Sequence, residues 1–252
     1  METSEKNIQN KKTVISIKNL CKKFGDQVVL DNFDLELYEE ENLVLMGKSG
    51  SGKSVMIKCL VGLMEPDSGE IEVLGKRILE MHQQEKDELR AEIGFLFQGS
   101  ALYDSMTVQE NLEFPLRRHK KKFDGHNTDA LVHEALENVG LAHTKDLMPA
   151  ELSGGMQRRI ALARALILKP RIILYDEPTT GLDPITAKEI ILLMMKIQEK
   201  YKTSSLIITH DVDCARVISN RMVLLLEGTN YAQGTFKELS TSEDPKIKAF
   251  FK

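Results

Sequence analysis

One segment constrains the fold of this chain more than any other: Gly47-Lys48-Ser49-Gly50-Ser51-Gly52-Lys53-Ser54. It matches G-x-x-x-x-G-K-[ST], follows an apolar run and precedes residues with helical spacing, which is the context that the pattern needs. The glycines allow the loop to wrap phosphates with its N–H groups, and the helix that begins near Lys53 turns its positive end toward them. We expect Lys53 to contact the β- and γ-phosphates of ATP, and the Ser54 hydroxyl to ligate Mg²⁺.

A second polar segment ends another apolar strand. In Ile172-Ile173-Leu174-Tyr175-Asp176-Glu177, two carboxylates follow the apolar residues, and Pro178 stops the strand. A carboxylate at a strand tip beside a phosphate-binding loop can hold Mg²⁺ through water, which is the role we expect for Asp176. Glu177 points elsewhere and can orient and deprotonate an attacking water as general base. A kinase needs only the first carboxylate, so the pair favours hydrolysis.

A third segment, Leu152-Ser153-Gly154-Gly155-Met156, opens a helix. A serine N-cap beside two glycines leaves several unpaired N–H groups at a positive helix end, which makes a second anion site. A monomer with one nucleotide has no obvious use for two such sites. In a head-to-tail dimer, however, the helix that begins at Ser153 could cap the nucleotide on the other chain's loop.

The order of the apolar runs predicts the fold class. Strand patterns at 171–175 and 205–209 each precede a helix, which predicts a mainly parallel sheet, whereas the leading strands at 14–20 and 26–38 look antiparallel. We therefore expect an α/β fold: a P-loop NTPase core with a mainly parallel sheet, an antiparallel N-terminal β subdomain and an inserted helical subdomain at about 99–168.

Length and composition limit the possible classes. The chain has 252 residues, enough for one large domain at 13–252 behind a polar tail at 1–12. Its net charge of −4 argues against nucleic acid as a partner. The three cysteines are widely spaced and form no disulfide framework, and no apolar run approaches the roughly 18 to 20 residues of a membrane span. Together these observations predict a cytoplasmic protein. The basic run at 117–122 is either a solvated loop or, less favoured, attracted to an anionic membrane surface.

In this order and spacing, the three segments resemble the ATP-binding cassette (ABC) family over about residues 13–240. The family's remaining elements also have counterparts. Gln98 looks like the glutamine that approaches Mg²⁺ and the attacking water, and Asp183 of Gly181-Leu182-Asp183 belongs to a loop that crosses the dimer interface. His210 looks like the histidine that contacts the γ-phosphate, and Phe24 matches the aromatic residue that stacks on adenine.

The resemblance implies an ATPase mechanism and a set of partners. Two chains would form a homodimer around two ATP–Mg²⁺, close, hydrolyse ATP and reopen. The movement would pass to an integral membrane permease through a groove lined by residues 99–115. The protein would then lie on the cytoplasmic face of the inner membrane. Catalytic roles would fall to Glu177, His210 and Gln98, and the ligands of Mg²⁺ would be Ser54, Gln98 and Asp176.

Shorter stretches resemble one branch of the family, the ATPase subunits of bacterial Mla (maintenance of lipid asymmetry) phospholipid transporters. Met156 stands where the family commonly has glutamine, which helps to name the branch. The other stretches are Phe97–Tyr103 (FQGSALY), Phe114–Arg117 (FPLR), Leu147–Leu152 (LMPAEL), Asp183–Thr186 (DPIT) and Asp244–Ile247 (DPKI). This branch would add a periplasmic lipid-binding MCE-type subunit and a small cytoplasmic accessory protein as partners.

Other functions remain open at this point. A soluble ABC-type assembly machine, such as one for iron–sulfur clusters, could have the same length. An ABC importer or exporter for another substrate would share the motifs. A small-molecule P-loop kinase would leave Glu177 and the helix start at Ser153 without a purpose. Association with a permease would separate the transporter from the soluble machine.

Overall fold

The computed structural model describes residues 11–119 and 123–251. Most of the predicted tail at 1–12, and residues 120–122 of the basic run, lie outside this part. The chain forms two compact units, one of residues 1–90 with 204–252 and one of residues 91–203. The predicted domain boundaries, including the helical subdomain at about 99–168, stay predictions.

The first unit begins with an antiparallel sheet in the order β2-β1-β4-β5. Its strands are β1 (Thr13–Phe24), β2 (Gln27–Tyr38), β4 (Ser68–Val73) and β5 (Lys76–Arg77). The alternation in β2 buries Phe33, Leu35 and Leu37 on one face. β1 continues four residues beyond the end predicted at Leu20, because its pairing with β2 persists through several register shifts as far as Phe24.

The same unit contains a second set of strands in the order β10-β9-β3-β8. β3 (Asn42–Gly47) pairs in parallel with β8 (Ser204–Ile208) and β9 (Arg221–Leu226), while β10 (Thr229–Gly234) is antiparallel to β9. Every residue of β3 and β8 is buried, as expected for central parallel strands that are covered on both faces. The antiparallel leading sheet and the mainly parallel core confirm the predicted α/β class.

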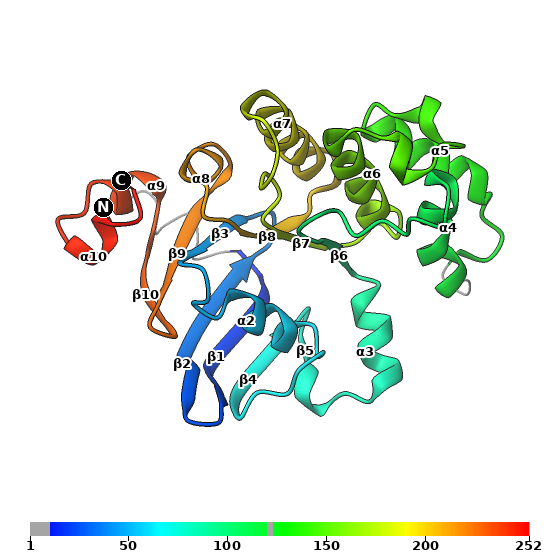
Figure 1. Ribbon diagram of the computed structural model, residues 1–252. Helices are drawn as coiled ribbons and strands as arrows, with labels where there is room; N and C mark the ends of the chain where they lie inside the picture. The colour runs from blue at the N-terminus through cyan, green and yellow to red at the C-terminus, as the bar shows by residue number, and fades with distance from the viewer. Residues whose placement is uncertain (1–10, 120–122, 252) are drawn as a thin grey trace. The chain divides into compact units, whose positions relative to one another are not determined.

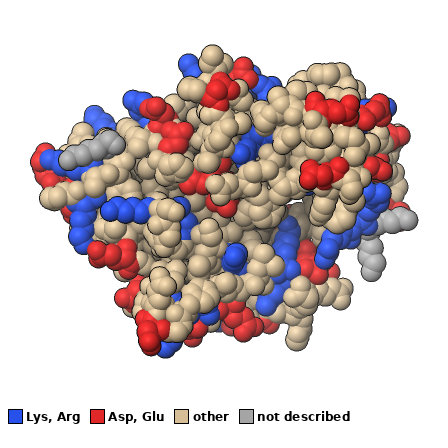
Figure 2. Space-filling model, viewed as in Figure 1, with Lys and Arg blue, Asp and Glu red and all other residues tan. Residues whose placement is uncertain are grey.

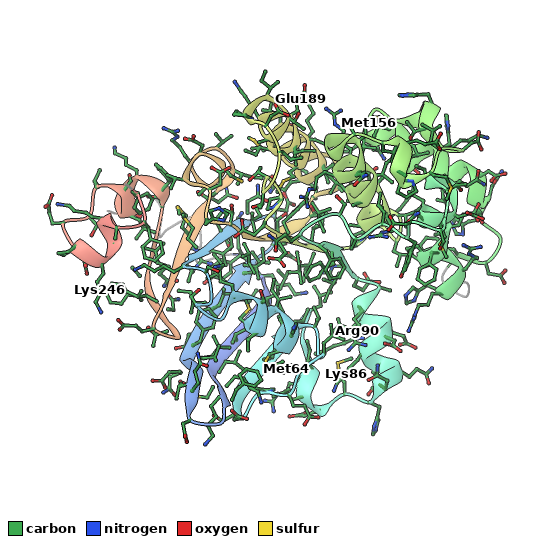
Figure 3. The ribbon with its side chains drawn as sticks, in the orientation of Figure 1. Met64, Lys86, Arg90, Met156, Glu189 and Lys246 are labelled. Carbon is green, nitrogen blue, oxygen red and sulfur yellow. The ribbon has the colours of Figure 1, made fainter. Side chains whose placement is uncertain are left out.

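Among the described residues of this unit, the helices are α2 (Lys53–Leu60), α3 (Gln83–Arg90), α8 (Val212–Ile218), α9 (Phe236–Ser240) and α10 (Pro245–Lys248), with a 3₁₀ turn at Ile78–Glu80. The sequence did not predict α3, whose residues are polar except for the buried Leu89. A side chain holds this helix in place: Arg90 Nε donates to Val61 O (2.9 Å) and Nη2 donates to Gly62 O (3.0 Å), just beyond the end of α2 (Figure 3). The helix predicted at 244–251 is shorter than expected, since α10 ends at Lys248.

The second unit pairs β6 (Ile93–Leu96) with β7 (Ile172–Asp176) in parallel. Its helices are α4 (Val108–Arg118), α5 (Thr128–Asn138), α6 (Gly154–Leu166) and α7 (Pro184–Tyr201), with 3₁₀ turns at Ala142–Thr144 and Pro149–Glu151. α4, α5 and α6 pack against one another around their own apolar core (Figure 1). α7 has Asp183 as N-cap and Pro184 at its first position, which confirms the predicted start of this helix.

Charged side chains of both signs are interspersed over the face seen in Figure 2. In the part of the chain that the structure describes, no helix has the length and apolar character needed to cross a membrane.

Candidate active site

The loop at 47–54 joins the end of β3 to the start of α2. Gly52 is the N-cap of α2, with a left-handed φ of 104° and no side chain to bond the first N–H groups. A Cβ added at Gly52 would lie 2.9 Å from Val29 O, so this turn requires glycine. The first turn of α2 therefore presents its N–H groups and positive end to whatever lies in the loop. The helix begins at Lys53, as the sequence predicts.

The polar side chains of this loop fit a phosphate group. Lys53 Nζ donates to Gly47 O (2.6 Å) and Lys48 O (2.9 Å), which holds the ammonium group against the loop. Ser51 Oγ is buried and has no hydrogen-bond partner among the described residues, as would suit a hydroxyl prepared for an oxygen ligand. Ser54 is exposed on the first turn of α2, where its hydroxyl is available to a cation.

His210 lies at the same sheet edge as this loop. β3 and β8 are parallel neighbours, with Leu45 opposite Ile208, so the segments that follow the two strands emerge together. His210 is exposed two residues beyond β8. The next residue, Asp211, caps α8 by accepting from Asp213 N (2.9 Å) and Cys214 N (3.0 Å), which fixes the turn.

Phe24 ends β1 and is 48% exposed. Lys22 Nζ lies 5.6 Å from the centroid of its ring. Much of the ring surface is therefore open to stacking, as the predicted contact with adenine requires.

In the second unit, Gln98 and the two carboxylates follow the carboxyl ends of two neighbouring parallel strands. β6 and β7 are parallel, with Leu96 opposite Tyr175, so Gln98 follows one strand where Asp176 ends the other and Glu177 comes next. Glu177 is only 9% exposed, and its Oε2 accepts from Thr180 Oγ1 (3.1 Å). This hydrogen bond fixes the orientation of the carboxylate. The backbone of Glu177 is left-handed, with a φ of 50°.

The helix starts at Ser153 and Asp183 are also in the second unit. Ser153 Oγ accepts from Met156 N (3.2 Å), which confirms the predicted N-cap of α6. A Cβ added at Gly155 would lie 2.6 Å from Thr186 Cγ2, so glycine allows the first turns of α6 and α7 to pack closely. Asp183 accepts from the side chain and backbone of Thr186, and these hydrogen bonds hold the pKa of Asp183 below its usual value.

The predicted site residues thus form two groups. Loop 47–54, Phe24 and His210 belong to the first unit, whereas Gln98, Asp176, Glu177, Ser153–Gly155 and Asp183 belong to the second. For Mg²⁺, the Ser54 hydroxyl and the Asp176 carboxylate are the hard oxygen donors that this cation takes together with phosphate and water. The roles of the individual residues stay predictions.

The sequence reasoning missed two arginines of α6. Arg158 is 4% exposed and donates to the carbonyl of Phe97, the residue before Gln98. Arg164 donates to the carbonyls of Ser100 and Ala101, just after it. The burial of Arg158 could have been predicted from the sequence, although its bonded partners could not. Arg158 precedes the apolar residues Ala161 and Leu162 by three and four positions and so shares their helix face.

Residues 30–180 match the family model described as ABC transporter. The chain belongs to the ABC transporter family. It is an ABC-type ATPase, in which ATP hydrolysis is coupled to transport, and it is the ATP-hydrolysing subunit of such a transporter.

Relatives of this ABC ATPase have several described substrates. A probable ribonucleotide transport ATP-binding protein of Mycobacterium leprae is 40% identical over 94% of this chain and 68% of its own length. An intermembrane phospholipid transport system ATP-binding protein of Haemophilus influenzae is 37% identical over 95% of this chain and 90% of its own. A methionine import ATP-binding protein of Clostridium tetani is 37% identical over 93% of this chain and 73% of its own length. The family is therefore shown, while the substrate differs among relatives.

Solved structures agree with the fold. Two structures of the ATP-binding cassette MJ0796 cover 88% of this chain and 98% of their own at 33% sequence identity, with TM-scores of 0.78 and 0.79. Both are described as dimeric, and the first as a post-hydrolysis state bound to ADP and Pi.

Proposed function

We propose that this ABC ATPase powers phospholipid transport through a separate membrane permease. The observation that carries the proposal is a groove of about 400 Å³ in the second unit. Its wall includes Phe97, Ala101, Tyr103, Phe114 and Pro115. These residues belong to the segments FQGSALY and FPLR, which resemble the phospholipid-transport branch. Part of the groove wall is therefore formed by segments that resemble this branch.

The chemistry of the groove suits a protein segment with an apolar surface. Phe95 and Phe97 stack with ring centroids 4.0 Å apart, and the rings of Tyr103 and Phe114 are 4.9 Å apart. Aromatic surfaces of this kind are enriched at protein interfaces. We propose that a cytoplasmic segment of the permease binds here, which would hold the ATPase at the cytoplasmic face of the inner membrane. The whole-length similarity to the Haemophilus relative supports phospholipid as substrate.

In the proposed site, loop 47–54 holds the phosphates of ATP and Phe24 stacks on the adenine. Ser54, Gln98 and Asp176 supply oxygen ligands for Mg²⁺, directly or through water. The cation, when bound, neutralises charge that develops on the phosphate oxygens. The ammonium group of Lys53, held against the loop by two carbonyls, can turn toward the β- and γ-phosphates.

The remaining residues act when two chains form a homodimer. Ser153–Gly155 of one chain bring the positive end of α6 to the γ-phosphate on the other, and Asp183 lies beside them. Closure excludes bulk water. Glu177 then takes a proton from the one water that attacks, and His210 donates a hydrogen bond to the γ-phosphate. The dimeric cassette structures support the homodimer. A periplasmic MCE-type subunit and a small accessory protein are further proposed partners.

The shared site makes a prediction for Ser153→Arg. We expect each chain still to bind ATP, because loop 47–54 is intact, while hydrolysis falls by about 100-fold or more, the usual cost of losing an anion-stabilising group. The arginine also removes an N-cap worth about 1 kcal/mol. Asn127→Arg controls for that loss, because Asn127 caps α5 and has no proposed role in the site. ATP turnover close to that of the control would contradict the two-chain site.

Purification with the permease tests the function itself. The tagged chain is isolated from detergent-solubilised membranes, and the lipids that accompany it are analysed. Wild-type protein is expected to retain a membrane subunit with phospholipid, whereas Tyr103→Asp, which puts a charge into the groove, is expected to lose it. Leu192→Asp is the matched control, since Leu192 on α7 is 45% exposed, close to the 43% of Tyr103.

Each alternative gives a different result in this experiment. A membrane partner without phospholipid would assign the ATPase to another substrate, such as the ribonucleotide or methionine named for its relatives. An active ATPase with no membrane partner would instead support a soluble ABC-type machine.

A further inference from the structure

We propose that Arg158 and Arg164 of α6 are positioning residues that hold Gln98 in a fixed place relative to Ser153–Gly155. The inference rests on the proposed roles of Gln98 and of Ser153–Gly155 in the nucleotide site. All of these residues belong to the second unit. The two arginines, called the α6 clamp below, bond the main chain on both sides of Gln98.

Arg158 bonds the residue immediately before Gln98. Its Nη1 donates to Phe97 O (2.9 Å) and its Nη2 donates to Thr180 O (3.2 Å). Thr180 in turn donates through its hydroxyl to Glu177. One guanidinium group therefore joins the segment of Gln98 to the segment of the proposed general base.

Burying Arg158 is costly for the fold. The side chain is 4% exposed, its Nε has no hydrogen-bond partner among the described residues, and burial lowers the pKa of its guanidinium group. The bonded carbonyls are neutral, so they offset desolvation of the charge less well than a carboxylate would. A buried cation with these partners indicates that its position serves the function of the protein, because an apolar side chain would be cheaper to bury.

Arg164 bonds the other side of Gln98. Its Nη2 donates to Ser100 O (3.1 Å) and Ala101 O (2.8 Å), and its Nη1 donates to the buried Asn111 (3.3 Å). The guanidinium carbon also lies 5.6 Å from the ring centroid of Tyr103, in the wall of the groove. Arg164 thus connects the segment after Gln98 to the proposed permease contact.

The backbone just after Gln98 depends on the bonds from Arg164. Ser100 and Ala101 both have left-handed φ angles, 68° and 48°, which cost energy in residues with a Cβ. Such a conformation persists only where the surroundings impose it, and here the carbonyls of both residues are bonded by Arg164. Since α6 begins directly after Ser153, movement of this helix would carry Gln98 with it. In the proposed dimer, α6 caps the nucleotide bound to the partner chain, whereas Gln98 serves the nucleotide bound to its own chain. The α6 clamp thereby links these two nucleotide sites.

The test measures kcat and KM for ATP in Arg158→Met, Gln98→Ala and the double variant. If Arg158 acts by placing Gln98, Arg158→Met should lower kcat by about 10- to 100-fold, the effect of a small misplacement of a catalytic group. KM should change by less than about threefold, because loop 47–54 is untouched. The double variant should be no slower than Gln98→Ala alone, because the arginine has nothing left to position.

Two further variants distinguish positioning from folding. Arg158→Lys keeps the charge and can bond one of the two carbonyls, so it should recover part of kcat; it also replaces Arg158→Met in the cycle if the latter does not fold. Arg159→Met is the matched control on the next residue. It removes the ion pair with the exposed Glu189 (2.6 Å; Figure 3 labels Glu189), which does not involve the segment of Gln98, and should leave kcat unchanged.

Different failures overturn different claims. Unchanged kcat in Arg158→Met, or losses that multiply in the double variant, would overturn the α6 clamp and leave the proposed site standing. Unchanged kcat in Gln98→Ala would overturn the proposed role of Gln98, and the α6 clamp with it.

Discussion

Glu177→Gln is expected to lower ATP hydrolysis by about 10²–10⁴, the usual span for losing a general base. The amide cannot accept a proton from the attacking water, but its oxygen can still accept the hydrogen bond from Thr180 Oγ1 that orients the side chain. The turn at the end of β7 should therefore keep its shape. ATP binding and ATP-driven dimerisation should remain, because neither requires the proton transfer.

Steady-state phosphate release and size-exclusion chromatography with ATP measure the two expectations for Glu177. Glu189→Gln is the control, because it makes the same chemical change at a surface ion pair of α7. Turnover of Glu177→Gln within about threefold of wild type would remove Glu177 from the role of base, since the smallest expected effect is about 100-fold.

Lys53→Ala is expected to lower ATP affinity by about 100-fold or more. Each charge-assisted hydrogen bond contributes about 1.5–3 kcal/mol, and the ammonium group is expected to contact two phosphates. The fold should survive, since α2 retains Gly52 as its N-cap. Fluorescence titration with a labelled ATP analogue measures the affinity.

Lys58→Ala is the matched control for Lys53, because Lys58 is an exposed basic residue in the last turn of the same helix. Removing it takes away the same charge, more than a full helical turn from the loop, and should leave the affinity unchanged. Tight binding of ATP by Lys53→Ala would contradict the assignment of the phosphate loop.

The regular parts of the fold follow from local patterns. Buried strands such as β3 and β7 appear as short apolar runs bounded by turn residues, and Asp183-Pro184 marks the start of α7. α3 was missed because a helix with one buried residue shows almost no apolar periodicity, and it is tied to the loop beyond α2 by Arg90, a contact distant in sequence.

The candidate site likewise contains residues that the sequence predicts and residues that only the structure reveals. Loop 47–54, Asp176, Glu177 and Ser153–Gly155 are recognisable because a local backbone shape or strand end demands those residues. The partners of Arg158 lie 61 and 22 residues away in the sequence. No local pattern specifies such a bond. The structure was needed to find that the helix opened by Ser153 also holds the main chain beside Gln98.

The left-handed backbone of Glu177 costs the folded chain free energy at a residue that is proposed to act in catalysis. A glycine would adopt the φ of 50° without steric strain and relieve about 1 kcal/mol. It would also remove a carboxylate that is nearly buried. Glycine also loses more backbone entropy on folding, and the variant lacks the hydrogen bond from Thr180 Oγ1, so these costs offset the relieved strain. Glu177→Gly should therefore fold about as well as the wild type while losing ATP hydrolysis. Stability screens of this protein should retain an activity measurement at every round.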